Sequence, residues 1–279
     1  MSKLCRVSFV QIAKRQPAKN KAIKAQTSKT KIVKKRYLLS LCAVFALWLY
    51  PAPAQAGYRP PRTARLPQGP AIPGGRRGGC AMPAGLGLTA LSPQSHVGRT
   101  QSLQPTLAWF VPSEVPYEAT FQLYRYDDGH WTLVDQRSLG QSRYGYMDYK
   151  LPATPELSAG NLYRWNIVLA CDPSRPSASQ AATAQFEIVP AQVSLDRSAI
   201  SPLQLADKYS DAGLWYDAIA ALSTHNFTAE TTTYLSQLLL ETALIDETNA
   251  SPAALLTPSP LRRIARLLTE ESSTPTVLQ

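Results

Sequence analysis

The first 56 residues contain no acidic side chain, although the chain of 279 residues has 19 Asp and Glu in all. The same segment holds 12 of the 29 Lys and Arg and so accounts for more than the whole net charge of +10. Residues 57–279 carry 17 basic and 19 acidic side chains, a net charge of −2. The body of the protein is therefore not basic, and we expect no nucleic-acid partner.

The sequence also lacks an apolar run of the length that a permanent membrane span needs, about 20 residues. Its main apolar run, Tyr37–Tyr50, has 14 residues, follows Lys34-Lys35-Arg36 and precedes the small-residue site Ala54-Gln55-Ala56. This order is typical of a secretory signal peptide, so we predict residues 1–56 as the signal, with cleavage after Ala56. A lipoprotein box at Leu39-Ser40-Leu41-Cys42 and a retained N-terminal anchor remain as alternatives.

Cysteine and histidine are scarce, with four and three residues, respectively. Two of the Cys lie in the predicted signal, which leaves Cys80 and Cys171. One even pair in an oxidising compartment predicts a disulfide. None of His96, His130 and His225 stands at ligand spacing to a Cys, so we expect no metal and no cofactor. We expect His96 to be exposed because Ser and Gly flank its segment.

The remaining chain changes character three times. Residues 57–79 are rich in Pro, Arg and Gly without any acid, which predicts a flexible tether. Its Arg76 and Arg77 are candidates for contact with an anionic partner or for weak contact with a membrane surface. Residues 80–190 follow a strand pattern and residues 191–271 a helical pattern, and we expect the tail, 272–279, to be disordered.

The predicted fold is mainly β with a C-terminal α part: an immunoglobulin-like β-sandwich followed by a short helical region with a single tetratricopeptide-like hairpin. Asp127-Asp128-Gly129 is typical of a hairpin turn, with a calcium site as the less favoured alternative. Alternating apolar residues separated by turn residues predict six strands. They are Thr106–Val111, Thr120–Tyr126, Trp131–Arg137, Gly145–Tyr149, Leu162–Cys171 and Ala182–Val189.

Period-two alternation indicates which strand faces meet water. Tyr124 and Tyr126 lie opposite the apolar Phe121 and Leu123, so we expect both tyrosines on an exposed face, and we expect Glu187 on the wet face of the last strand. Exposed tyrosines suit sugar stacking or a protein contact. Cross-strand stabilisation of a wet sheet face is the alternative explanation.

The C-terminal part has helical periodicity, and the first two predicted helices match the helix-turn-helix of one tetratricopeptide repeat. We predict helices at Pro202–Ser210, Trp215–Thr224, Glu230–Leu244 and Leu261–Glu271. A single repeat cannot form a solenoid, so we expect it to pack on the sandwich or on a partner. The residues that carry the match are Leu205, Ala206, Tyr209, Gly213, Trp215, Ala218, Ile219 and Leu222.

The last predicted helix is amphipathic, with Leu261, Ile264, Leu267 and Leu268 on one stripe. We interpret the stripe as core, with a membrane-surface or partner-docking helix as the alternative. Catalytic motifs are missing: the sequence has no Gly-rich phosphate loop, no nucleophile elbow, no helical two-His metal motif and no EF-hand. We therefore expect no enzymatic activity, and a hydrolase with carboxylates far apart in sequence is the less favoured alternative.

Seven short motifs in order resemble a cyanobacterial family known only as domain of unknown function 928. The resemblance covers about Arg76 to Leu244 and agrees with pairing Cys80 to Cys171, whereas Ala81 stands where members commonly carry Arg or Lys. The motifs are Arg77-Gly78-Gly79-Cys80, Leu88-Thr89-Ala90-Leu91, Pro105-Thr106-Leu107, Leu151-Pro152, Tyr163-Arg164-Trp165, Cys171-Asp172-Pro173 and Gly213-Leu214-Trp215-Tyr216-Asp217-Ala218.

This resemblance implies a cyanobacterial source and an exported protein, but no activity. We expect a non-enzymatic protein-interaction module in the periplasm or at the cell surface, with the thylakoid lumen as a further destination. Binding of carbohydrate or another envelope polymer through exposed aromatic residues of the sheet is the alternative.

Overall fold

The computed structural model describes residues 57–68, 79–194, 200–223, 228–249 and 258–273. The predicted signal peptide and the lipoprotein-box alternative lie outside the described residues, as do Arg76 and Arg77. Among the residues described, no helix is both long enough and apolar enough to cross a membrane. The account below concerns the compact unit that begins at Gln55.

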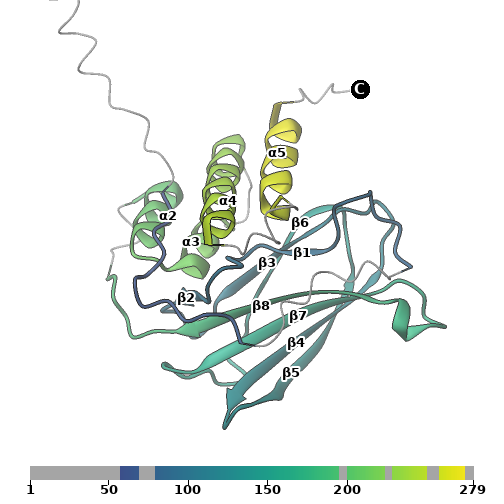
Figure 1. Cartoon of the computed structure of the whole chain (residues 1–279), viewed down its shortest axis with the longest axis horizontal. Coiled ribbons are helices and arrows are strands. Elements are labelled where there is room, and N and C mark those ends of the chain that lie inside the picture. Colours follow the sequence, from purple (N-terminus) through teal and green to yellow (C-terminus); the bar gives the residue numbers. More distant parts are fainter. Residues whose placement is uncertain (1–56, 69–78, 195–199, 224–227, 250–257, 274–279) are drawn as a thin grey trace, which may run out of the picture. The chain divides into compact units, whose positions relative to one another are not determined.

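Within the described residues eight strands form two sheets, so this part of the chain is mainly β as predicted (Figure 1). The smaller sheet has the order β1-β3-β6, and the larger has the order β2-β8-β7-β4-β5, in which only β2 pairs with its neighbour in parallel. The strands are β1 (Thr89–Ala90), β2 (Gly98–Thr100), β3 (Thr106–Val111), β4 (Glu118–Asp127), β5 (His130–Gln141), β6 (Gly145–Lys150), β7 (Leu162–Ala170) and β8 (Gln180–Ile188).

Six of these strands lie where the sequence predicted them, with no end displaced by more than four residues. Strands β1 and β2 were missed because two or three residues are too short to show an alternation. The predicted inward faces are confirmed: Phe121 and Leu123 of β4 are buried, as are Trp165 and Ile167 of β7. The core therefore lies between the two sheets.

Four α-helices follow the strands in the described part of the chain, and Figure 1 shows them on the opposite side from β4 and β5. This helical layer borders both sheets, since Trp215–Leu222 contacts β2 of the larger sheet as well as β3 of the smaller one. One continuous apolar core joins the helices to both sheets. The helices are α2 (Pro202–Asp211), α3 (Trp215–Leu222), α4 (Ala229–Asn249) and α5 (Pro260–Ser273).

Helix α3 joins the helical layer to both sheets. The Trp215 indole donates to the Leu91 carbonyl over 3.0 Å, and the Tyr216 hydroxyl donates to the Gln185 carbonyl over 3.0 Å. The Trp165 indole in turn donates to the Tyr216 hydroxyl over 3.2 Å. Burial raises the pKa of Tyr216 to about 12, which keeps the phenol neutral in this network. Helix α3 thus packs on the sheets, which is one of the two positions expected for this helical segment.

Helix α5 packs its apolar stripe inward. Leu261 and Ile264 are fully buried, and Leu268 is 5% exposed. On the adjacent face, Arg262 forms an ion pair with Glu247 of α4, and that bond lowers the pKa of Glu247. The core interpretation of the stripe is therefore confirmed. The helix ends at Ser273, two residues inside the tail that we expected to be disordered.

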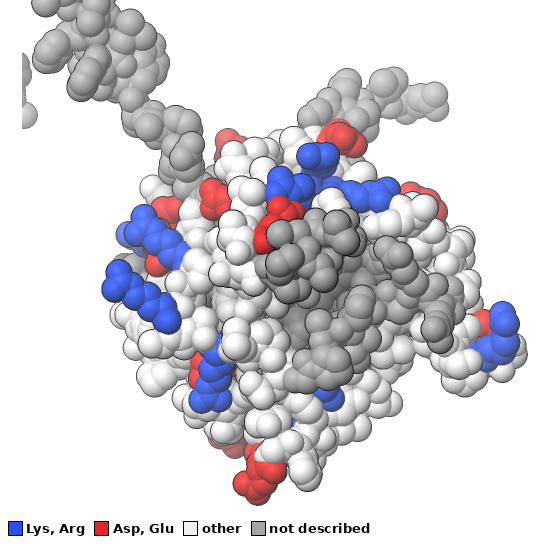
Figure 2. Space-filling view, viewed as in Figure 1, with Lys and Arg blue, Asp and Glu red and all other residues white. Residues whose placement is uncertain are grey.

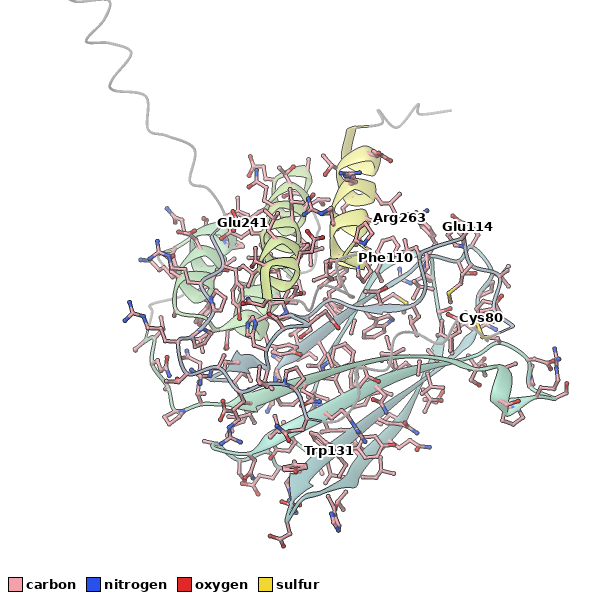
Figure 3. The ribbon with its side chains drawn as sticks, viewed as in Figure 1. Cys80, Phe110, Glu114, Trp131, Glu241 and Arg263 are labelled. Carbon is pink, nitrogen blue, oxygen red and sulfur yellow. A yellow bond between two sulfur atoms is a disulfide. The ribbon has the colours of Figure 1, made fainter. Side chains whose placement is uncertain are left out.

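The predicted disulfide joins Cys80, which precedes β1, to Cys171, which directly follows β7. It closes a separation of 91 residues and lies at the end of the sheets opposite Trp131, where Figure 3 labels Cys80. In the chain-entropy model, closing such a long loop raises the free energy of the unfolded chain by on the order of 4 to 5 kcal/mol.

The expectation of a flexible tether is wrong for residues 57–68, which we call the strap. Tyr58 is only 4% exposed, and its ring packs edge-on against Trp215 at a centroid distance of 5.1 Å. The Arg59 amide donates to the Ser210 carbonyl, and the Val97 amide donates to the Arg65 carbonyl. The Pro and Arg content concealed an ordered segment, because a single buried ring and a few backbone bonds fix it without any periodic pattern.

Gly213 has two reasons to be glycine. Its φ of +73° lies in the left-handed region that other residues adopt at a cost. A Cβ at this position would also lie 2.9 Å from the Arg59 carbonyl oxygen of the strap. The turn between α2 and α3 therefore requires glycine both for its own backbone and for close approach of the N-terminal segment.

Candidate binding surface

The outer face of the five-stranded sheet carries a cluster of aromatic rings around an arginine. Figure 3 labels one of the rings, Trp131, at the end of the sheet far from the helices. Strand β4 directs Tyr124 and Tyr126 to this face, and β5 places Trp131 directly opposite Tyr126. The Tyr126 and Trp131 rings lie 4.9 Å apart between centroids, and all three rings are partly exposed. The predicted outward orientation of both tyrosines is confirmed.

Arg164 of β7 lies among these rings. Its guanidinium carbon is 4.9 Å from the centroid of the Tyr124 ring and 4.6 Å from that of Trp131. Both distances fall within the range of cation–π contacts, which hold the guanidinium plane against ring faces. Rings and cation together form one platform, which we call the ring platform: Tyr124, Tyr126, Trp131 and Arg164.

A row of amide side chains crosses the sheet beside the ring platform. The Gln122 amide donates to the Gln136 oxygen over 3.2 Å, the Asn166 amide donates to the Gln122 oxygen over 3.4 Å, and the Thr183 hydroxyl donates to the Asn166 oxygen over 3.0 Å. We call these three amides and one hydroxyl the amide row: Gln136 of β5, Gln122 of β4, Asn166 of β7 and Thr183 of β8. The row presents donors and acceptors across four adjacent strands.

The part of this face formed by β8 differs from our expectation. We expected Glu187 to meet water, but it is buried and pairs with Arg99 over 3.3 Å and with Arg65 over 3.1 Å. The strap also covers Gln185, whose side chain accepts from the Gln68 amide over 2.9 Å. The strap thus covers the β8 side of the face and leaves the β4, β5 and β7 side open.

The other predicted residues of the helical hairpin form packing and not an open site. Ala206, Trp215 and Ala218 are fully buried, and Tyr209 and Leu222 are at most 2% exposed. Leu205 is half-buried and lines a groove of about 710 Å³ between this hairpin and the smaller sheet. The groove is also lined by Asp148, Lys150, Tyr209 and Ser223. No sequence pattern indicated this groove, because its walls are about 50 residues apart or more in the chain.

A buried polar cluster links the strap to α4. The Tyr58 hydroxyl and His96 Nε2 are hydrogen-bonded over 2.8 Å, and His96 Nδ1 and the Ser95 hydroxyl are bonded over 3.1 Å. The Asp246 carboxylate accepts from the Ser95 amide over 2.8 Å. Burial, with a contribution from Arg99, lowers the pKa of His96 to about 4.

This cluster corrects the expected exposure of His96, which is only 6% exposed. Both of its ring nitrogens are engaged within the protein, so the arrangement fixes the strap and leaves no ring nitrogen for a substrate. The described residues contain no group of three or more His, Cys, Asp or Glu that could hold a metal ion. The face in Figure 2 is mostly uncharged, with basic and acidic side chains interspersed.

Two members of the ring platform were missed as functional residues. Trp131 was identified only as the start of a predicted strand, and Arg164 only as part of a family motif. The signal was present in the register, because Arg164 lies opposite Tyr124 once β7 pairs with β4. Pairing of strands about 40 residues apart is a property of the tertiary structure, and alternation within each strand does not reveal it.

The described part of the chain is a mainly β protein with two sheets and a helical cover, which presents an aromatic sheet face. The chain belongs to the family described as Domain of Unknown Function (DUF928), whose model matches residues 72–252. The family resemblance of the seven motifs is therefore confirmed. No curated protein matches the chain.

Similar solved structures are distant. They include the twitchin kinase region from C. elegans (Fn31-NL-kin-CRD-Ig26), with 17% identity and a TM-score of 0.21, and astrotactin-2, a vertebrate-specific and perforin-like membrane protein, with 13% identity and a TM-score of 0.25. The matches cover 39% and 67% of this chain but only 19% and 36% of those chains.

Proposed function

We propose that this protein is an exported, non-enzymatic binding module of the cell envelope, and that it binds an envelope polysaccharide on the outer face of its five-stranded sheet. The observation that carries the proposal is the ring platform beside the amide row. The apolar C–H face of a sugar ring packs on aromatic rings, while amide groups exchange hydrogen bonds with sugar hydroxyls. Both kinds of group face the same side of one rigid sheet, which holds them in place without a loop rearrangement.

The proposed compartment rests on the signal-like N-terminus and on the disulfide. A cross-link between Cys80 and Cys171 persists in an oxidising environment, such as the periplasm, the cell surface or the thylakoid lumen. We extend the proposal to the finer fold: an immunoglobulin-like arrangement of the two sheets, with α2 and α3 as a single tetratricopeptide-like hairpin. Trp165, buried on the strand that leads to Cys171, supports the first part.

Binding of the purified protein to an array of envelope glycans tests this proposal. We expect saturable binding that falls at least ten-fold in Trp131→Ala and in the double variant Tyr124→Ala, Tyr126→Ala, because these changes remove the rings on which the sugar packs. Tyr144→Ala is the matched control, since Tyr144 is 38% exposed but lies outside the five-stranded sheet, against Phe110 of β3. Equal binding by all variants would contradict the proposal.

A protein partner is the second candidate, and the free edge of β5 favours it. Strand β5 is 12 residues long and ends the five-stranded sheet, so within the described residues no strand pairs with its outer edge. Leu133 at this edge is 47% exposed. An added strand from a partner would satisfy these backbone groups.

Crosslinking from native envelope separates the two candidates. A partner held through the β5 edge would be lost in Leu133→Lys, which places a charge on the edge strand, and retained in Trp131→Ala. Retention of the partner in Leu133→Lys would contradict the edge contact.

A further inference from the structure

Arg164 occupies the middle of the outer face and lacks the anionic partner that a half-buried cation normally has. It lies between Tyr124 of β4 and Gln185 of β8 in the register of the sheet. Its Nε is buried and makes no hydrogen bond, and its guanidinium forms no ion pair with any described residue. The rings of Tyr124 and Trp131 hold it in place without neutralising its charge.

The carboxylate on the neighbouring strand β8, Glu187, is already paired, because it binds both Arg65 and Arg99. Together with Arg164 of β7, this region of the sheet and the strap therefore carries three cations for one carboxylate. Burial also lowers the pKa of Arg164, because its charge is partly withdrawn from water without a compensating anion.

A guanidinium in this setting suits a carboxylate. Its planar fork donates two parallel hydrogen bonds to one carboxylate, and these charge-assisted bonds are about twice as strong as neutral ones. The rings on which Arg164 rests also restrict its rotamers, so less side-chain freedom is lost when the anion binds. An anionic ligand would thus compensate Arg164 for the hydration that its guanidinium loses between the rings.

The neighbouring groups decide between sources of the carboxylate. The amide row lies two residues along the strands from Tyr124 and Arg164, a distance of about 7 Å at the usual rise of a strand. A uronic acid polymer supplies a ring face for Trp131, hydroxyls for the amide row and a carboxylate for Arg164. An acidic peptide such as poly-glutamate supplies the carboxylate and backbone amides but no sugar ring face for Trp131.

We propose that the outer face binds a polysaccharide that contains uronic acid residues, with Arg164 as the residue that binds the carboxylate. This inference rests on the proposed function, because it assigns the chemical class of ligand to the same surface. It adds a requirement that polysaccharide binding alone does not make, namely that the affinity depends on the charge of the sugar.

Calorimetric titration of the purified protein with polygalacturonate and with its fully methyl-esterified form tests this requirement, because esterification removes the charge and leaves the backbone of the polymer. We expect at least ten-fold tighter binding of the acid form by the unaltered protein. In Arg164→Gln this preference should disappear, whereas Arg164→Lys should keep part of it through charge without the fork. Arg143→Gln, which removes an exposed charge between β5 and β6, is the matched control and should keep the full preference.

Several results would overturn the inference. They are equal binding of the two polymers, no binding of polygalacturonate, a preference unchanged in Arg164→Gln, or tighter Arg164-dependent binding of poly-glutamate than of polygalacturonate. Loss of binding to both polymers in Trp131→Ala, with no effect of Arg164→Gln, would retain the proposed function and reject only the charge requirement. Thermal unfolding of each variant confirms that it is folded.

Discussion

The contribution of the strap to stability can be predicted quantitatively, because Tyr58 is its one buried residue. Replacing Tyr58 with Ala removes a ring that is 4% exposed and contacts both His96 and Trp215. Substitutions of buried aromatic residues by Ala cost about 3 to 5 kcal/mol of stability. For a folded body of this size, that corresponds to a fall in Tm of roughly 6 to 20 °C.

Tyr58→Phe separates the ring from its hydroxyl. This change keeps the packing and leaves the buried Nε2 of His96 without its partner at 2.8 Å. An unsatisfied buried polar group costs about 1 to 3 kcal/mol, so we expect Phe to fall between the unaltered protein and Ala. Leu66→Ala in the same strap is the control, because Leu66 is 71% exposed and its loss should cost no more than about 0.5 kcal/mol.

Urea unfolding followed by Trp fluorescence measures all three variants. Trp215 lies against Tyr58, so its emission reports both global unfolding and local release of the strap. If Tyr58→Ala were no less stable than Leu66→Ala, the strap would be the flexible tether that the sequence predicted, and the contacts described here would not stabilise the protein.

Two further predictions concern the residues around the strap. Gly213→Ala should lower the stability measured by thermal unfolding more than Gly160→Ala does. Both glycines have positive φ, but only at Gly213 would a Cβ meet the Arg59 carbonyl. Equal losses would show that the strap does not approach this turn. The pKa of His96 is lowered to about 4 in the folded state. The unfolded state, with a pKa of about 6.5, therefore binds more protons below that pH. As the pH falls from about 6.5 to about 4, up to about 3 kcal/mol of folding stability should be lost. His96→Gln should lack this component, and a parallel pH dependence in the variant would refute the assignment.

Much of the chain was readable from local pattern. Strand β3 lies at the predicted residues, and the inward side of β4 was assigned correctly, since alternation depends only on neighbours in sequence. Ala206 and Ala218 were assigned to a helix contact for the same reason, because close helix packing demands small side chains at fixed spacing, and both are fully buried. The family was recognised from short motifs that lie in turns and at strand ends.

The candidate site was only half visible in the sequence. Tyr124 and Tyr126 were identified from the alternation of their own strand. Arg164 was not, because its role arises from the pairing of β7 with β4 and from the contact that Trp131 of β5 makes with it across β4. Glu187 was placed on the correct face but with the wrong environment, since the residues that cover it come from the strap.

By itself, the sequence determined the class of fold, the pairing of the only two cysteines outside the predicted signal, and the side of each strand that faces the core. These properties follow from periodicity and residue counts, which are local or global sums along the chain. The tertiary structure decided which polar residues are buried and which cation lacks a partner. Those properties depend on segments such as the strap and β8, more than 100 residues apart, whose contacts have no signature in either segment alone.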